Sequence, residues 1–387
     1  MKKNFFLFAL AALIMAACEP NVPFSGGGGG GGKGSTEIPD DSDADPNPEV
    51  DDPTVTLPGV TSDVDTINGE IVIRLDMTGV IDPSTGEYLK LYGTNSPKQN
   101  VWVEVDDKPK GILVENLSEG SGAQAKVDLV FLVDNSGSMD QEADSIANGI
   151  DAWSRVLAGS GLDIRFGVVG YEGQITGALD ITTATDLSDF LDYSYGIYRT
   201  YHFAGSNAND LESLAPSYYN GGGMDECGMA AFHFANDNFH FRTGANRVYV
   251  NFTDEPNYYL GIDAFRTTWL RDNWQPSMGT IHSVYSDGAG TEEEVASWTY
   301  ISEGYSDYPW DMATYTGGTK LFANYDFSGI TLGSLPVTGA MQNSYIIRFT
   351  NVTLDNKMHK VKVTIKTADG NVAGELTFNI LFAAPNN

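Results

Sequence analysis

Hydrophobic and polar residues follow two different periods along the chain, and the period changes twice. Between residues 60–122 and again between 340–387, short apolar runs alternate with polar positions, as in 70–75 and 361–365. A period of two is typical of β-strands with one buried face. Because each flank alone is too small to bury a large core, we expect both to contribute strands to one sandwich. Two separate small sandwiches are the alternative.

The segment between these flanks, residues 126–335, alternates apolar runs with stretches of helical spacing. Residues 127–133 are apolar apart from Asp128, which is typical of a strand buried on both faces of a parallel sheet. Helical spacing follows over 143–157. A further helix is expected at 228–239, and further strands at 164–169, 247–252, 281–285 and 312–322. This order predicts a doubly wound, mostly parallel, Rossmann-like α/β sheet, inserted in or flanked by the β-sandwich.

The N-terminal region has the pattern of an export signal followed by a spacer. In residues 1–17, two lysines precede an apolar core that is too short to span a bilayer as a stable helix. Residues 15–18 resemble a bacterial lipobox, which implies that Cys18 carries lipid and anchors the chain in the envelope, facing outward on the outer membrane. Ordinary secretion with a free Cys18 thiol is the alternative. The Gly-, Asp- and Pro-rich stretch 18–59 predicts a flexible tether.

Charge and cysteine content exclude several classes of function. A formal net charge of −30 at pH 7 opposes binding to phosphate backbones, so nucleic acid is not expected as a partner, and membrane contact is expected through the lipid only. A disulfide framework is excluded, because Cys227 is the only cysteine besides Cys18. We expect Cys227 to be a small buried residue, since no basic neighbour favours its thiolate. The histidines lack zinc-site spacing.

A candidate metal motif, Asp134-Asn135-Ser136-Gly137-Ser138, follows the strand 127–133 directly. Alternation places the side chains of Asp134, Ser136 and Ser138 on one side of the loop, and hard oxygen ligands suit Mg²⁺. At a strand-to-helix turn, this motif resembles the metal-ion-dependent adhesion site of von Willebrand factor A and integrin I domains. The resemblance implies a site for Mg²⁺, with Mn²⁺ or Ca²⁺ as substitutes.

The same resemblance implies ligands from two further loops. A glycine run precedes Asp225 and Glu226, as in integrin β subunits, and on that match Glu226 is the ligand while Asp225 is the competing candidate. One of the two carboxylates has the alternative role of favouring a helix dipole. Thr253-Asp254, after the strand 247–252, matches the family's Thr-Asp pattern, which implies that Asp254 binds through a water.

A second cation site beside the first would use Asp140 and Glu142. Integrin β subunits carry two acidic residues shortly after the Asp-x-Ser-x-Ser motif, but here Gln141 takes one of those places. The alternative is that these carboxylates only charge the first turn of the following helix.

These observations predict a metal-dependent binding or adhesion protein rather than an enzyme. The partner would be a protein or glycan whose carboxylate completes the coordination of the metal. A non-enzymatic scaffold subunit of a surface assembly is the alternative, since some domains of the family have lost the metal. No general base beside the ligand candidates and no nucleophile or nucleotide-binding motif is found in the sequence.

Overall fold

The computed structural model describes residues 37–67, 69–120, 124–191, 205–206, 209–221, 225–325 and 330–383. The predicted export signal 1–17, the lipidation candidate Cys18 and the tether up to residue 36 lie outside this range. None of the helices in the described ranges is long and apolar enough to cross a membrane.

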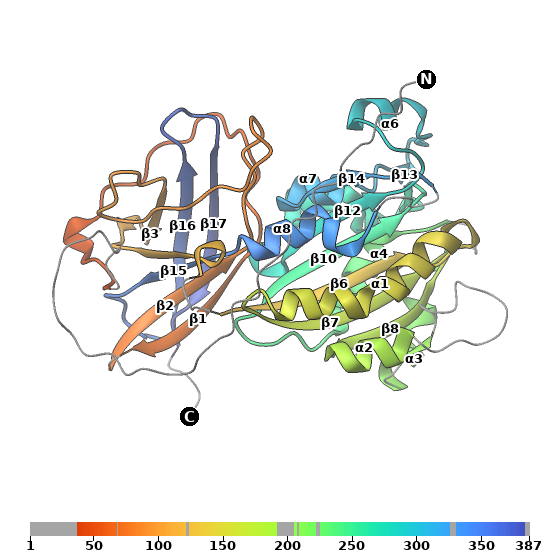
Figure 1. Cartoon of the computed structure of the whole chain (residues 1–387), viewed down its shortest axis with the longest axis horizontal. Helices are drawn as coiled ribbons and strands as arrows, with labels where there is room; N and C mark the ends of the chain where they lie inside the picture. Colours follow the sequence, from red (N-terminus) through yellow and green to blue (C-terminus); the bar gives the residue numbers. More distant parts are fainter. Residues whose placement is uncertain are drawn as a thin grey trace, which may run out of the picture. The chain divides into compact units, whose positions relative to one another are not determined.

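The α/β domain is built on a mostly parallel sheet of seven strands, counted over the described residues, in the order β14-β12-β10-β6-β7-β8-β9 (Figure 1). The strand bounds are β6 (Ala125–Asp134), β7 (Leu162–Tyr171), β8 (Ile175–Thr182), β9 (Gly205–Ser206), β10 (Asn246–Thr253), β12 (Thr280–Tyr285) and β14 (Lys320–Phe322). β8 runs antiparallel to β7, and the β14, β12, β10, β6 and β7 strands are mutually parallel. The predicted doubly wound sheet is confirmed.

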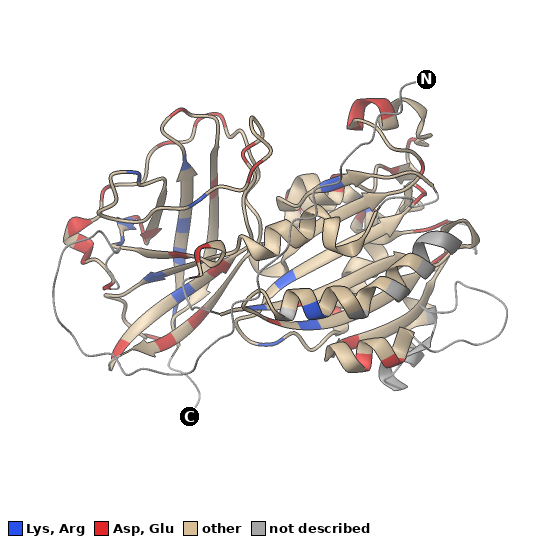
Figure 2. Cartoon of the chain, viewed as in Figure 1, with Lys and Arg blue, Asp and Glu red and all other residues tan. Residues whose placement is uncertain are grey.

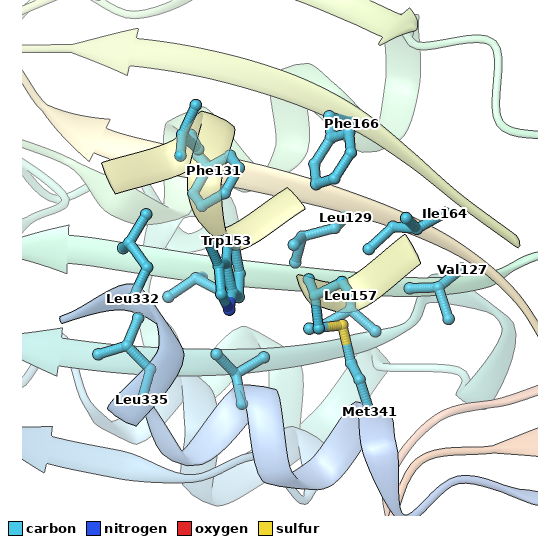
Figure 3. Close-up of a cluster of buried hydrophobic side chains, with 14 of the residues drawn as sticks. Val127, Leu129, Phe131, Trp153, Leu157, Ile164, Phe166, Leu332, Leu335 and Met341 are labelled. Atoms are coloured by element: carbon cyan, nitrogen blue, oxygen red, sulfur yellow. The ribbon is translucent and has the colours of Figure 1, made fainter. Parts of the chain in front are cut away.

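Helices cover both faces of this sheet. Successive residues of β6 point to opposite faces, and both sets are mostly apolar, so each face needs a covering layer. Leu129 and Phe131 face α1 (Asp140–Ala158), whereas Val130 and Leu132 face α4 (Gly228–Asn238). In Figure 3, Trp153 of α1 lies against Phe131, with ring centroids 5.6 Å apart. The other helices are α2 (Ala184–Leu191), α3 (Asn209–Tyr218), α5 (Thr267–Asn273), α6 (Glu292–Trp298), α7 (Asp311–Thr316) and α8 (Pro336–Gln342).

The strand predicted at 312–322 is wrong over its first half. Residues Asp311–Thr316 form α7, which ends at Gly317 in the left-handed conformation, and only Lys320–Phe322 form a strand. Six residues are too few for helical periodicity to separate a helix from a strand.

The two flanks form one sandwich, and the alternative of two sandwiches is wrong. Its described sheets have the orders β1-β2-β15-β5 and β17-β16-β3-β4, so each combines strands from both ends of the sequence. Their inward side chains share one core that includes Leu75, Val103, Ile347 and Val363. The bounds are β1 (Val60–Ile67), β2 (Glu70–Met77), β3 (Val101–Val105), β4 (Lys108–Pro109), β5 (Leu113–Asn116), β15 (Tyr345–Phe349), β16 (Met358–Lys366) and β17 (Ala373–Leu381).

Residues 37–59, predicted to belong to the flexible tether, instead pack as a strap along the sandwich. Lys110 Nζ lies 2.6 Å from Asp41 Oδ2, and a Cβ on Gly111 would lie 2.2 Å from the carbonyl oxygen of Pro39. Leu57 is buried in the sandwich core. The strap then reaches the α/β domain, where the N–H of Gly59 donates to Thr280 Oγ1 over 2.7 Å. For residues 18–36, which lie outside the described range, the tether stays a prediction.

Charged side chains stabilise both domains at a few defined places, although carboxylates are spread widely over the molecule (Figure 2). In the α/β domain, Arg242 donates from its backbone N–H and from Nε to the fully buried Asp128, each over 2.7 Å. In the sandwich, the two ring nitrogens of His359 lie 2.7 Å from Asp106 Oδ2 and 2.9 Å from Asp355 Oδ1. The carboxylates raise the pKa of His359 by hydrogen bonding to its charged form.

Candidate metal site

The candidate ligands lie at the carboxyl end of the sheet, where the strand order reverses. From β6 the chain builds β7 and β8 on one side, then crosses to β10 and continues through β12 to β14 on the other. In doubly wound sheets the crevice at such a switch point is the usual ligand site. Asp134 ends β6 and Thr253 ends β10, so both lie at the switch point.

The first loop presents Asp134, Ser136 and Ser138 in a connected arrangement. Asp134 is fully buried, and its Oδ1 accepts the backbone N–H of Ser136 over 2.9 Å. The hydroxyls of Ser136 and Ser138 are 3.0 Å apart. A short 3-10 helix, Gly137–Met139, follows Ser136 and leads directly into α1 at Asp140.

The third loop, after β10, meets the first loop through two side-chain hydrogen bonds. Thr253 Oγ1 donates to Asp134 Oδ2 over 2.8 Å. Ser138 Oγ donates to Asp254 Oδ1 over 3.1 Å. The structure therefore brings Asp134, both serines and Asp254 into one hydrogen-bonded chain.

The second loop places Asp225 and Glu226 differently. Glu226 is buried, and its backbone oxygen accepts the N–H of Tyr258 over 2.8 Å. Asp225 Oδ2 instead accepts the hydroxyl of Tyr305 over 2.8 Å. Glu226 acts electrostatically on Asp134, whereas Tyr305, the partner of Asp225, directly precedes β13 (Ser306–Asp307), which pairs with β11 (Asn257–Tyr258).

Several carboxylates lie close enough together at the candidate site to raise one another's pKa. Burial, and then the charges of Glu226 and Asp254, hold the pKa of Asp134 well above its ordinary range. Burial also raises the pKa of Glu226 to about 7, with contributions from Glu255, Asp254 and Glu172. Burial raises the pKa of Asp254 as well. A site that keeps several carboxylates together at the cost of their ionisation favours a cationic ligand.

Three further carboxylates surround the candidate ligands and were not singled out from the sequence. Glu172 directly follows β7, Glu255 follows Asp254, and Asp287 lies two residues beyond β12. Burial raises the pKa of both Glu255 and Asp287, and Asp287 acts on Asp254 and Glu255. We call these three residues the acidic rim. The sequence carries a signal for these residues, because acidic residues that directly follow several parallel strands meet at one edge of a sheet.

The oxygen atoms at the candidate site can hold a hard cation only if the serine hydroxyls bind it together with the carboxylates. Among the described residues, no three His, Cys, Asp or Glu side chains are grouped so that they hold a metal by themselves. The oxygen atoms that the structure does bring together come from one buried carboxylate, two serine hydroxyls and Asp254, with Glu226 beside them. Such a mixture of carboxylate and hydroxyl oxygen suits Mg²⁺.

The second cation site predicted at Asp140 and Glu142 stays a prediction. Both residues lie in the first turn of α1, and their side chains are outside what the structure describes. Cys227 is fully buried, and burial raises its pKa, which confirms a small core residue rather than a reactive thiol.

Comparisons with known proteins return only distant likenesses. No family model and no curated protein matches the chain. Among solved structures, the pilus adhesin SpaC from Lactobacillus rhamnosus GG in its open conformation is 10% identical, over 83% of this chain and 47% of its own, with a TM-score of 0.31. Proximal thread matrix protein 1 from the mussel byssus is 12% identical, over 56% of this chain and 45% of its own, with a TM-score of 0.30.

The ArnB paralogue VWA2 from Sulfolobus acidocaldarius is 11% identical, over 84% of this chain and 76% of its own, with a TM-score of 0.28. The chain thus spans about half the length of the adhesin and of the matrix protein. The family resemblance of the metal motif stays a prediction from its residues.

Proposed function

We propose that this chain is a metal-dependent binding protein of the bacterial cell envelope. Mg²⁺ would be held by Asp134, Ser136 and Ser138, with Glu226 from the second loop and Asp254 through a water. The observation that carries this proposal is the hydrogen-bonded convergence of side chains from separated segments at the switch point of the sheet. A bound dication would supply positive charge and an open coordination position there.

The residues of the chain prepare that position before any partner arrives. The backbone N–H of Ser136 and the hydroxyl of Thr253 hold the two oxygens of Asp134 in a fixed orientation. We propose Glu226 as the ligand from the second loop, because Glu226 acts electrostatically on Asp134 whereas Asp225 Oδ2 accepts the hydroxyl of Tyr305.

The acidic rim makes the proposed binding depend sharply on the metal. A protein or glycan that offers a carboxylate would be repelled by Glu172, Glu255 and Asp287 unless a dication neutralised the centre of the site. We propose that the partner's carboxylate completes the coordination and that surrounding contacts add affinity. A lipid on Cys18 would anchor the chain and display the site at the outer-membrane surface.

Calorimetric titration of the full chain with Mg²⁺ and Mn²⁺ tests the metal directly. We expect measurable heat and saturation with the wild type and none with Asp134→Ala. Asp189→Ala, which removes an exposed carboxylate on α2, is the matched control and should bind like the wild type. The absence of heat from the wild type with both metals would overturn the proposal.

A metal-free scaffold is the second candidate function. The observation in its favour is that carboxylates alone do not complete a cation site within the described ranges. Under this alternative, Asp134→Ala would leave assembly with other envelope proteins intact, and EDTA would change neither assembly nor the stability of the chain.

A further inference from the structure

Two buried polar side chains lie beneath the segments that carry the candidate ligands. Tyr171 is the last residue of β7 and Asn251 lies in β10, and their exposed fractions are 1% and 0%. The hydroxyl of Tyr171 donates to Asn251 Oδ1 over 2.8 Å. Because β6 lies between β7 and β10, this hydrogen bond spans the end of the strand that carries Asp134.

Register and alternation place this pair on the same face of the sheet as the ligands. Tyr171 is level with Asp134 in the ladder between β6 and β7, and Asn251 is level with Leu132 in the ladder between β6 and β10. Leu132 and Asp134 are two residues apart, so their side chains point to one face, and the same holds for Asn251 and Thr253. This is the face that α4 covers.

The pair contacts all three candidate segments. In the first loop, the N–H of Asn135 donates to the backbone oxygen of Tyr171 over 2.6 Å. In the second, a Cβ on Gly228 would lie 2.7 Å from Asn251 Oδ1, so the amide rests directly against the backbone two residues after Glu226. The third segment is the continuation of β10 itself, where Thr253 donates to Asp134.

The pair lies between the apolar core and the acidic site, since Asp134 and Glu226 act electrostatically on Tyr171. Val169, Leu132 and Phe232 belong to the same core cluster as Tyr171. Asn251 Nδ2 is buried and finds no hydrogen-bond partner among the residues that the structure describes. A core built for stability alone would contain apolar side chains at these positions, because a buried polar group without a partner is unfavourable.

We propose that Tyr171 and Asn251 are positioning residues of the candidate metal site, which hold the first, second and third loops at a fixed separation before a cation binds. This inference rests on the proposed function. Partners that orient the ligands of a metal, without touching the metal, contribute strongly to its affinity. The hydroxyl of Tyr171 acts through Asn251, whose amide lies against the backbone at Gly228, and the first loop is joined to Tyr171 by the backbone hydrogen bond from Asn135.

The variant Tyr171→Phe removes one hydroxyl and keeps the ring in the core. Tyr249→Phe is the matched control, because Tyr249 is fully buried on the same strand as Asn251 but lies further from the ligand-bearing end. For the full chain, Mg²⁺ affinity is measured by calorimetry and the midpoint of thermal unfolding is measured in EDTA. We expect roughly tenfold weaker Mg²⁺ binding for Tyr171→Phe and wild-type affinity for Tyr249→Phe.

The two measurements separate positioning from stability. A residue that only stabilises the core would lower the unfolding midpoint in EDTA and leave the Mg²⁺ affinity of the folded protein unchanged. That result for Tyr171→Phe would overturn this inference, but it would leave the proposed function intact. If Tyr171→Phe does not fold, Asn251→Ser is measured in its place, with the same tenfold loss expected and the same unchanged affinity as the contrary result. Absence of Mg²⁺ binding by the wild type would overturn both proposals.

Discussion

Replacement of Glu226 by glutamine tests whether charge crowding at the candidate site destabilises the metal-free protein. In the unfolded chain Glu226 has its ordinary pKa of 4.5, whereas in the folded chain its pKa is about 7, with burial as the main cause. The folded state therefore keeps this proton to higher pH than the unfolded state. The stability associated with Glu226 is fully present below pH 4.5 and is lost as the pH rises through about 7.

The size of the effect follows from the shift in pKa. A rise from 4.5 to about 7 corresponds to about 3 kcal/mol of lost stability at pH 8. Solvent screening at the edge of the sheet reduces this to about 1–2 kcal/mol. Because glutamine carries no charge, Glu226→Gln should be more stable than the wild type by that amount at pH 8 in EDTA. The difference should shrink towards zero at pH 5.

Denaturant unfolding in EDTA between pH 5 and 8.5 measures this difference directly. Glu375→Gln, which removes an exposed carboxylate on β17, is the matched control and should follow the wild type at every pH. Saturating Mg²⁺ at pH 8 should reverse the order, because the wild type gains stability from the metal and Glu226→Gln gains less. If Glu226→Gln is no more stable than the wild type in EDTA at pH 8, the reasoning on charge crowding is refuted.

Three further predictions concern the stability of the two domains and of the strap. Arg242→Met should cost about 3–5 kcal/mol in denaturant unfolding, because Asp128 is left buried without its partner, and adding Asp128→Leu should restore most of that loss. His359→Gln should flatten the fall in stability above pH 6.5, because the raised pKa of His359 gives stability at low pH that is lost as the pH rises through it; unchanged pH profiles would contradict this. Gly111→Ala should displace the strap at Pro39 and expose it to limited proteolysis, with wild-type resistance as the contrary result.

The architecture was largely predictable because each buried strand of the α/β sheet is a continuous apolar run. The strand predicted at 127–133 became β6, and the strand at 247–252 became β10, within two residues at each end. The position of the candidate ligands followed from the rule that sites lie at the carboxyl ends of parallel strands. At that edge Thr253 donates to Asp134 and Ser138 donates to Asp254, and their role as metal ligands stays a prediction.

The parts that were not predictable depend on single tertiary contacts. The strap has the polar composition of a tether. It packs on the sandwich through contacts of Asp41 and Leu57, which the spacing of apolar residues in the sequence does not reveal. The sequence does not separate Asp225 from Glu226, and the hydrogen bond to Asp225 comes from Tyr305, eighty residues further along the chain. The polar pair beneath the site is equally invisible in a sequence, since a tyrosine and an asparagine in two strands carry no local signal.

The interrupted sandwich has a consequence for the order in which the protein is made. β15 lies between β2 and β5, and β16 lies between β17 and β3, so two of the last three described strands to be synthesised are interior members of the two sheets. Until they emerge, β2 and β3 lack their central partners, whereas the α/β domain is contiguous and complete. During synthesis or export, the nascent N-terminal strands would therefore need protection from aggregation while the inserted domain folds first, and truncation before Tyr345 would leave both sheets open.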